Sequence, residues 1–135
     1  MPLPKEVFIA YSDDDRHIVN DLVNELDAYN IKTWFSQNNI FGGQAWQREI
    51  GNALKRCDYF IVILTNNSIT SYWVRQELEY AFNHNQYRDK IIPLLIEQCD
   101  YENLSWILGN IQHIDMTNSI QVGLPNLLGE WGIII

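Results

Sequence analysis

A glutamate between two aromatic residues at helical spacing is the strongest chemical signal in this sequence. Trp73, Glu77 and Tyr80 follow one another at intervals of four and three residues. Residues spaced in this way share one face of an α-helix, so the carboxylate is expected to lie between two rings. Such a glutamate is either an ordinary solvated side chain beside two packed aromatics or a charge presented to a bound ligand.

The helix that carries Glu77 is expected to lie against a sheet. The apolar run 59–64 precedes it and predicts a buried strand, and a turn-like segment separates the two. A stripe on the adjacent helix face is apolar throughout and consists of Val74, Leu78 and Ala81. This stripe can anchor the helix on the sheet while Glu77 points elsewhere.

The rest of the chain alternates apolar runs with amphipathic stretches. Nearly continuous apolar strands are typical of a parallel sheet covered on both faces. We therefore predict an α/β fold, a three-layer flavodoxin-like sandwich whose five-stranded parallel sheet has the order 2-1-3-4-5 and helices on both faces. Strands are expected at 7–11, 31–35, 59–64, 91–96 and, more weakly, 112–116, and helices at 16–28, about 45–57 and 71–80.

Two local features argue against regular structure. Pro93 lies within the run 91–96 and is a mild objection to a central position of that strand. Gly123 and Pro125 are expected to interrupt any helix in the range 119–131.

The composition is that of one globular domain. The chain has 135 residues, 47% hydrophobic and 19% charged, and is expected to form a single domain over 1–135. Its apolar ending at 132–135 indicates a domain that continues into a longer chain. The net charge of -8 and the scattered basic residues argue against nucleic acid as a partner. We see no signal peptide and no membrane span, and therefore expect no membrane partner and a cytoplasmic location.

Several kinds of site are not indicated. The chain lacks GxGxxG after its first strand, GxxxxGK[ST] and the GxSxG elbow, so no nucleotide cofactor, P-loop or hydrolase nucleophile is predicted. His17, His84 and His113 are not spaced as metal ligands, and no metal is expected. Cys57 and Cys99 form no CxxC pattern and are interpreted as ordinary thiols.

An acidic cluster, 13–15, follows the first strand. Phosphoacceptor domains of two-component signalling share this feature, but they also need an Asp at the end of the third strand, where this chain has Leu64 and Thr65. The favoured explanation of the cluster is helix capping, with carboxylates at the helix N-terminus.

Ligands of such a sheet bind beyond the carboxyl ends of its strands. Three segments are expected to meet there: 11–15, 36–46 and the start of the helix 71–80.

Motifs in these segments resemble the Toll/interleukin-1 receptor (TIR) domain, in particular its bacterial, NAD-cleaving branch. The stretch 7–12 is similar to the opening strand of that family, and 34–46 is similar to its second strand, BB loop and the start of the next helix. The stretch 71–78 is similar to the segment in which a Trp stands four residues before the catalytic Glu. Each motif alone is weak, but three in order at matching separations are specific.

The resemblance implies cleavage of the bond between nicotinamide and ribose in NAD+, which is then the substrate and not a cofactor. Nicotinamide leaves a cationic ring as a neutral molecule, so no general acid is required and one carboxylate suffices. The products are nicotinamide plus either ADP-ribose or a cyclic isomer. By the resemblance, the catalytic residue is Glu77 and the substrate-binding residues are Tyr11, Ser12, Asp13, Phe41, Trp46 and Trp73.

Other TIR domains are the second implied partner, through self-association of the loop 38–43, whose tip is Ile40-Phe41. The alternative function is a non-catalytic interaction module that works by this assembly alone. The two functions are compatible if assembly completes the active site, and bacterial immune signalling is the implied context. An effector secreted into a host would share the chemistry and differ in destination.

The chain departs from the family pattern around the expected site. Ser36 and Gln37 occupy a region where the family often carries an acidic residue, and Ser12 and Asp13 stand where some animal relatives have arginines. Phe41 falls where those relatives carry a loop glutamate. These changes leave the catalytic position intact and concern the adenosine diphosphate half of the substrate.

Overall fold

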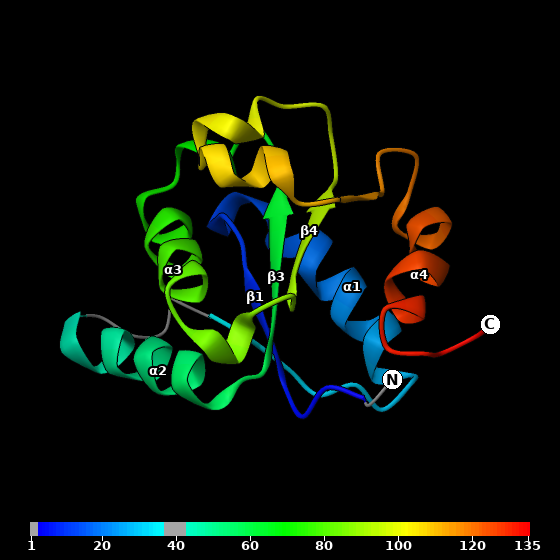
Figure 1. The fold of residues 1–135 in the computed structure, drawn as a ribbon, viewed down its shortest axis with the longest axis horizontal. Helices are drawn as coiled ribbons and strands as arrows, with labels where there is room; N and C mark the ends of the chain where they lie inside the picture. Colours follow the sequence, from blue (N-terminus) through cyan, green and yellow to red (C-terminus); the bar gives the residue numbers. More distant parts are fainter. Residues whose placement is uncertain (1–2, 37–42) are drawn as a thin grey trace.

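The computed structural model describes residues 3–36 and 43–135 (Figure 1). All pairings in its five-stranded sheet are parallel, and the order is β2-β1-β3-β4-β5. The predicted fold class and strand order are confirmed. The strands are β1 (Val7–Ala10), β2 (Thr33–Phe35), β3 (Tyr59–Leu64), β4 (Ile91–Leu95) and β5 (Ile114–Asp115).

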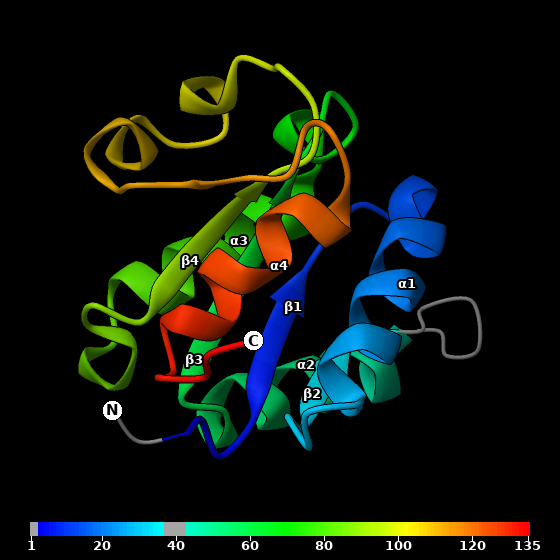
Figure 2. The ribbon, with the colours of Figure 1, turned by 90° about the vertical axis from the view of Figure 1, so that its right-hand side faces the viewer.

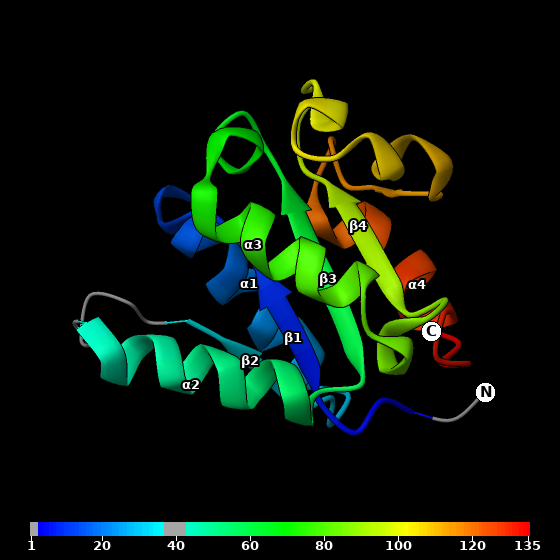
Figure 3. The same ribbon diagram turned by 60° about the vertical axis from the view of Figure 1, so that its left-hand side comes forward.

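Helices cover both faces of the sheet. One face is covered by α1 and α4 (Figure 2) and the other by α2 and α3 (Figure 3). Short 3₁₀ turns lie in several of the connections. The α-helices are α1 (Arg16–Asp27), α2 (Gly43–Arg56), α3 (Tyr72–Phe82) and α4 (Ile120–Gly129).

Successive strand residues supply the two core layers in turn. In β1, Val7 and Ile9 pack with α1 and α4, whereas Phe8 and Ala10 pack with α2 and α3. This alternation follows from the two-residue period of a strand and explains why the strands are apolar throughout. From Phe60 to the end of the strand, β3 is completely buried.

The prediction of an interrupted helix near the C-terminus is wrong, because α4 is continuous with Pro125 inside it. Ser119 caps the helix by accepting a hydrogen bond from the Val122 N–H at 3.2 Å. Gly123 allows the helix to approach the end of β5, because a Cβ there would lie 2.5 Å from Met116 Cγ. The leucines that follow are buried, and this burial offsets the hydrogen bond that Pro125 cannot make.

The objection raised by Pro93 is also wrong, since β4 lies inside the sheet between β3 and β5. Pro93 is in register with Val62 of β3. On the other side, β5 is two residues long and pairs only with Leu94 and Leu95. The ladder on that side therefore begins after the proline.

We predict that Gly123→Ala lowers the free energy of unfolding by about 1–3 kcal/mol, because the new methyl group meets atoms that cannot all move. The Asp115 carbonyl oxygen lies 2.7 Å from the position of this Cβ and belongs to the backbone. Gly51→Ala is the matched control, since a Cβ there meets nothing within 4 Å and alanine favours the helix. Urea unfolding measures both variants, and equal effects would contradict the packing of α4 on β5.

Candidate active site

The position of α3 depends on its cap and on its apolar stripe. Ser71 accepts a hydrogen bond from the Val74 N–H at 3.3 Å and so begins the helix. The predicted stripe, Val74, Leu78 and Ala81, is buried against the sheet. With this face fixed, Glu77 lies on the neighbouring face.

The Glu77 side chain is buried, and its residue is only 7% exposed. Among the described residues, no hydrogen bond and no ion pair reaches its carboxylate. Burial raises the pKa of Glu77 to about 8, because the charged form loses its hydration without gaining a partner. In the free protein at neutral pH this group is mainly a neutral carboxylic acid held in an apolar setting.

Aromatic side chains gather around Trp73, which lies one helical turn before Glu77. The rings of Trp46 and Trp73 meet edge to face, with centroids 4.7 Å apart and an interplanar angle of 89°. Tyr72 adds a third ring, 5.3 Å from Trp73. Tyr72 is 65% exposed and Trp73 is 38% exposed, so these rings form a partly open aromatic wall.

Tyr11 lies just beyond the end of β1, and its ring meets that of Phe35 edge to face. Burial is the main cause that raises the pKa of Tyr11; the positive charge of Arg16 opposes the shift, and the carboxylates of Asp13 and Glu77 add to it. The pKa of Tyr11 therefore depends on charges at the start of α1 and on the charge of Glu77. Its hydroxyl donates a hydrogen bond to the carbonyl of Ser36, to whose Oγ the Trp46 Nε1–H also donates, at 2.9 Å.

Asp13 does not face the crevice as an uncompensated negative charge. Its Oδ1 lies 2.5 Å from the Arg16 Nη2 in an ion pair that spans one turn. Ser12 is buried, and its carbonyl accepts a hydrogen bond from the Asp15 N–H at 2.8 Å. The structure thus brings Tyr11, Asp13 and Arg16 together at the carboxyl end of β1.

The capping part of the explanation of the acidic cluster is wrong, although its three carboxylates do lie at the start of the helical segment. Neither Ser12 nor Asp15, which occupy the capping positions, makes a side-chain capping bond. Asp15 is buried instead, and its carboxylate accepts hydrogen bonds from Thr65 Oγ1 at 2.6 Å and Asn67 Nδ2 at 2.9 Å. These bonds tie the start of α1 to the turn between β3 and α3. Polar side chains in that turn need a hydrogen-bond acceptor, and the Asp15 carboxylate supplies it.

Sequence reasoning gave no role to three residues beside this site, although Ser36 belongs to the segment 36–46 that was expected there. Tyr72 was detectable as an aromatic next to Trp73, and Arg16 as a cation three residues after Asp13. No local signal marks Ser36, because its two donors come from distant positions. The predicted site residue Phe41 and positions 38–42 of the proposed self-association loop lie outside the described residues.

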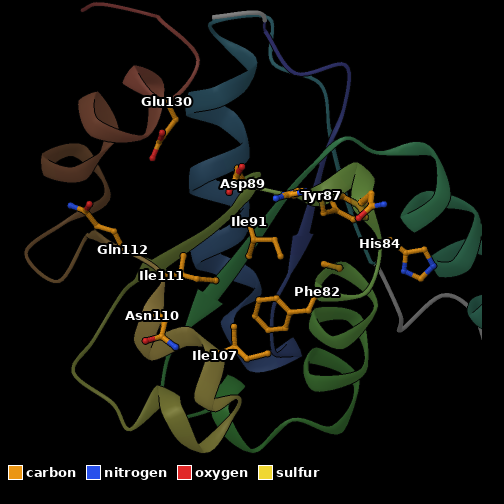
Figure 4. Close-up of a pocket in the computed structure, with 13 residues that line it drawn as sticks. Phe82, His84, Tyr87, Asp89, Ile91, Ile107, Asn110, Ile111, Gln112 and Glu130 are labelled. Atoms are coloured by element: carbon orange, nitrogen blue, oxygen red, sulfur yellow. The ribbon is translucent and has the colours of Figure 1, made fainter.

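A cavity of about 640 Å³ lies elsewhere, at the amino end of β4 (Figure 4). Phe82, Ile91 and Ile107 point into a common apolar space, and Asp89 and Glu130 stand at its rim. Glu77 does not line this cavity. A ligand in this cavity would therefore bind away from Glu77.

Other groups add little reactivity in the described part of the chain. Within residues 3–36 and 43–135, no three His, Cys, Asp or Glu side chains are placed to hold a metal ion. Burial raises the pKa of the Cys57 thiol to about 12, so it stays protonated. None of the helices built from these residues has the length and apolar character to cross a bilayer.

The motifs at the carboxyl edge of this sheet identify the family. The TIR domain family matches residues 7–128, which is nearly the whole chain. The chain belongs to the TIR domain family. Solved TIR domains show the same fold. The TIR domain of the Toll-related receptor TRR-2 from Hydra magnipapillata superimposes on this chain with a TM-score of 0.74 and 23% sequence identity. The superposition covers 93% of this chain and 96% of the TRR-2 domain. The TIR domains of the activated Roq1 resistosome give a TM-score of 0.69 at 18% identity over 93% and 98% of the two chains.

Among curated proteins, this TIR domain is similar to the NAD(+) hydrolase TcpC of Escherichia coli O6:H1, with 30% identity over 92 residues. It is also similar to the "probable 2' cyclic ADP-D-ribose synthase TcpO" of Methanobrevibacter olleyae, with 23% identity over 126 residues. The matches cover 67% and 93% of this chain but only 30% and 37% of the lengths of those proteins.

We predict that Glu77→Gln stabilises the protein increasingly as the pH rises. In the unfolded chain the carboxyl ionises near 4.5, whereas in the folded protein it keeps its proton up to about pH 8. Between these two pH values the unfolded chain gains free energy by ionising, whereas the folded protein does not, so the wild type becomes less stable as the pH rises from 4.5 to about 8. The amide of the variant stays neutral in both states and therefore avoids this loss of stability. The gain of the variant above pH 8 is on the order of 5 kcal/mol.

Urea unfolding from pH 4 to 9 measures this difference, with Glu79→Gln as the control because Glu79 is exposed on the same helix. A stability difference between Glu77→Gln and the wild type that does not change with pH would show that Glu77 is not desolvated.

Proposed function

We propose that this TIR domain cleaves the bond between nicotinamide and ribose in NAD+, with Glu77 as its catalytic residue. The observation that carries the proposal is the buried Glu77 carboxyl, which lacks a charged partner among the described residues and bears a raised pKa. A folded protein keeps such a destabilising group where function needs it. The curated relatives named as NAD(+) hydrolases support the choice of substrate.

The substrate supplies the charge that the free site lacks. The nicotinamide ring of NAD+ is cationic, and a positive charge close to a carboxyl lowers its pKa. Binding therefore favours ionised Glu77 and releases its proton to solvent. As the glycosidic bond breaks, positive charge moves from the ring to the ribose, where the carboxylate stabilises the oxocarbenium-like transition state.

The groups around Glu77 have roles that fit this reaction. Trp46 and Trp73 offer ring surfaces for the nicotinamide and exclude water from the breaking bond. Tyr11 forms the floor, and Ser12 and Asp13 lie beside it, where Arg16 compensates the charge of Asp13 near the substrate phosphates. A role for Phe41 stays a prediction.

The fate of the ribosyl cation determines the second product. Attack by water gives ADP-ribose, and attack by a hydroxyl or adenine nitrogen of the same molecule gives a cyclic isomer. Both kinds of product are represented in the names of the curated relatives. Chromatography of the products distinguishes the two.

Self-association is part of the proposal. TIR domains occur together in the activated Roq1 resistosome, whose TIR fold this chain shares. We propose that contacts between copies through the loop 38–43 complete the active site, as part of bacterial immune signalling in the cytoplasm.

We expect the purified domain to release nicotinamide from NAD+ at high protein concentration, and Glu77→Gln to reduce the rate at least about a hundredfold, because the amide cannot supply the negative charge. The measurement is nicotinamide release followed by chromatography. Glu79→Gln is the matched control and keeps the wild-type rate. Release that is unchanged in Glu77→Gln removes Glu77 from its role, and no release by the wild type under assembling conditions favours the non-catalytic interaction module.

A further inference from the structure

We propose that Ser36 is a positioning residue of this site, which holds the side chains of Tyr11 and Trp46 in place through two hydrogen bonds. The proposal rests on the proposed function, because the two aromatic side chains are those expected to contact NAD+. It assigns a role to a residue that directly follows β2 and that acts through Tyr11 and Trp46.

Ser36 offers two acceptors to two donors. Its Oγ accepts the Trp46 Nε1–H at 2.9 Å, and its backbone carbonyl accepts the hydroxyl proton of Tyr11. An indole N–H can only donate, so a half-buried tryptophan needs an acceptor in a defined place. Ser36 supplies this acceptor without adding a charge to the site.

The two donors come from different layers of the protein. Tyr11 packs against the core between the sheet and helices α1 and α4, whereas Trp46 packs against the core between the sheet and helices α2 and α3. Ser36 lies at the edge of the sheet between them, directly after Phe35, which pairs with Ile9 of β1. A single residue thus fixes the distance between side chains that no shared helix or strand connects.

Two series of contacts connect Ser36 with the surroundings of Glu77. In the first, Ser36 binds the Trp46 indole, and the Trp46 ring packs edge to face on Trp73, one helical turn before Glu77. In the second, the Ser36 carbonyl accepts a hydrogen bond from Tyr11, whose pKa is raised in part by the charge of Glu77. Loss of the indole hydrogen bond frees the Trp46 ring to turn, which admits water to the carboxyl and moves the wall away from the nicotinamide.

The test is steady-state NAD+ cleavage by Ser36→Ala, Ser36→Thr, Trp46→Phe and the double variant Ser36→Ala/Trp46→Phe. We expect Ser36→Ala to lower kcat/KM about tenfold and Ser36→Thr, which keeps the hydroxyl, to stay within about threefold of the wild type. Trp46→Phe removes the same hydrogen bond from the other side. The double variant is therefore expected to be no slower than Trp46→Phe alone.

Ser119→Ala is the matched control. It removes a serine hydroxyl that accepts a hydrogen bond from the Val122 N–H at the start of α4, away from the site. It is expected to lower stability and to leave kcat/KM unchanged. If Ser36→Ala keeps kcat/KM within twofold, if Ser36→Thr is as slow as Ser36→Ala, or if the effects of the two single variants multiply in the double variant, the proposal is overturned.

A second readout separates this proposal from the proposed function. If the wild type releases no nicotinamide, cleavage of NAD+ is refuted. The hydrogen bond between Trp46 and Ser36 is then tested by the indole N–H resonances in a proton–nitrogen NMR spectrum. We expect Ser36→Ala to shift the resonances of Trp46 and Trp73 and to leave that of Trp131, which is buried in the opposite layer, in place. An unshifted Trp46 resonance overturns the contact itself.

Discussion

The chemistry proposed for this TIR domain depends on one unfavourable interaction, the burial of the Glu77 carboxyl in an apolar setting. Nothing in the described part of the chain compensates this group by an ion pair, and its pKa rises to about 8 as a result. A protein tolerates such a cost only where the surroundings are held rigidly. In the proposed function this cost becomes an advantage when the cationic substrate binds, because solvent does not screen its attraction to the ionised Glu77 carboxylate.

The rigidity comes from both core layers. The stripe of Val74, Leu78 and Ala81 fixes α3 on the sheet, and the apolar strand β3 stabilises the layers on either side. The buried Asp15 binds Thr65 and thereby ties the β1 end of the sheet to the turn before α3. These contacts position the Glu77 helix relative to Tyr11 without touching the carboxyl.

Local periodicity predicted much of this arrangement, and long-range contacts account for what it missed. The strands, the helices and the helix face that carries Glu77 follow from repeats of two and of three to four residues, which are properties of adjacent residues. The strand order was predicted from the fold class that this alternation of strands and helices indicates. The depth of the Glu77 burial, the partners of Asp15 and the two bonds of Ser36 depend on residues far apart in the sequence. The continuity of α4 was missed because the packing of Gly123 on β5 outweighs the local penalty of Pro125.

The central claim is that one desolvated carboxyl, ionised as the cationic substrate binds, drives cleavage of NAD+. The most direct test is the dependence of kcat/KM on pH from 5.5 to 9.5, which reports the ionisation of groups in the free protein. We expect kcat/KM to rise about tenfold per pH unit at low pH and to level off above about pH 8, where Glu77 is ionised. A value of kcat/KM that is constant over this range, or one that levels off near pH 5, would contradict this claim.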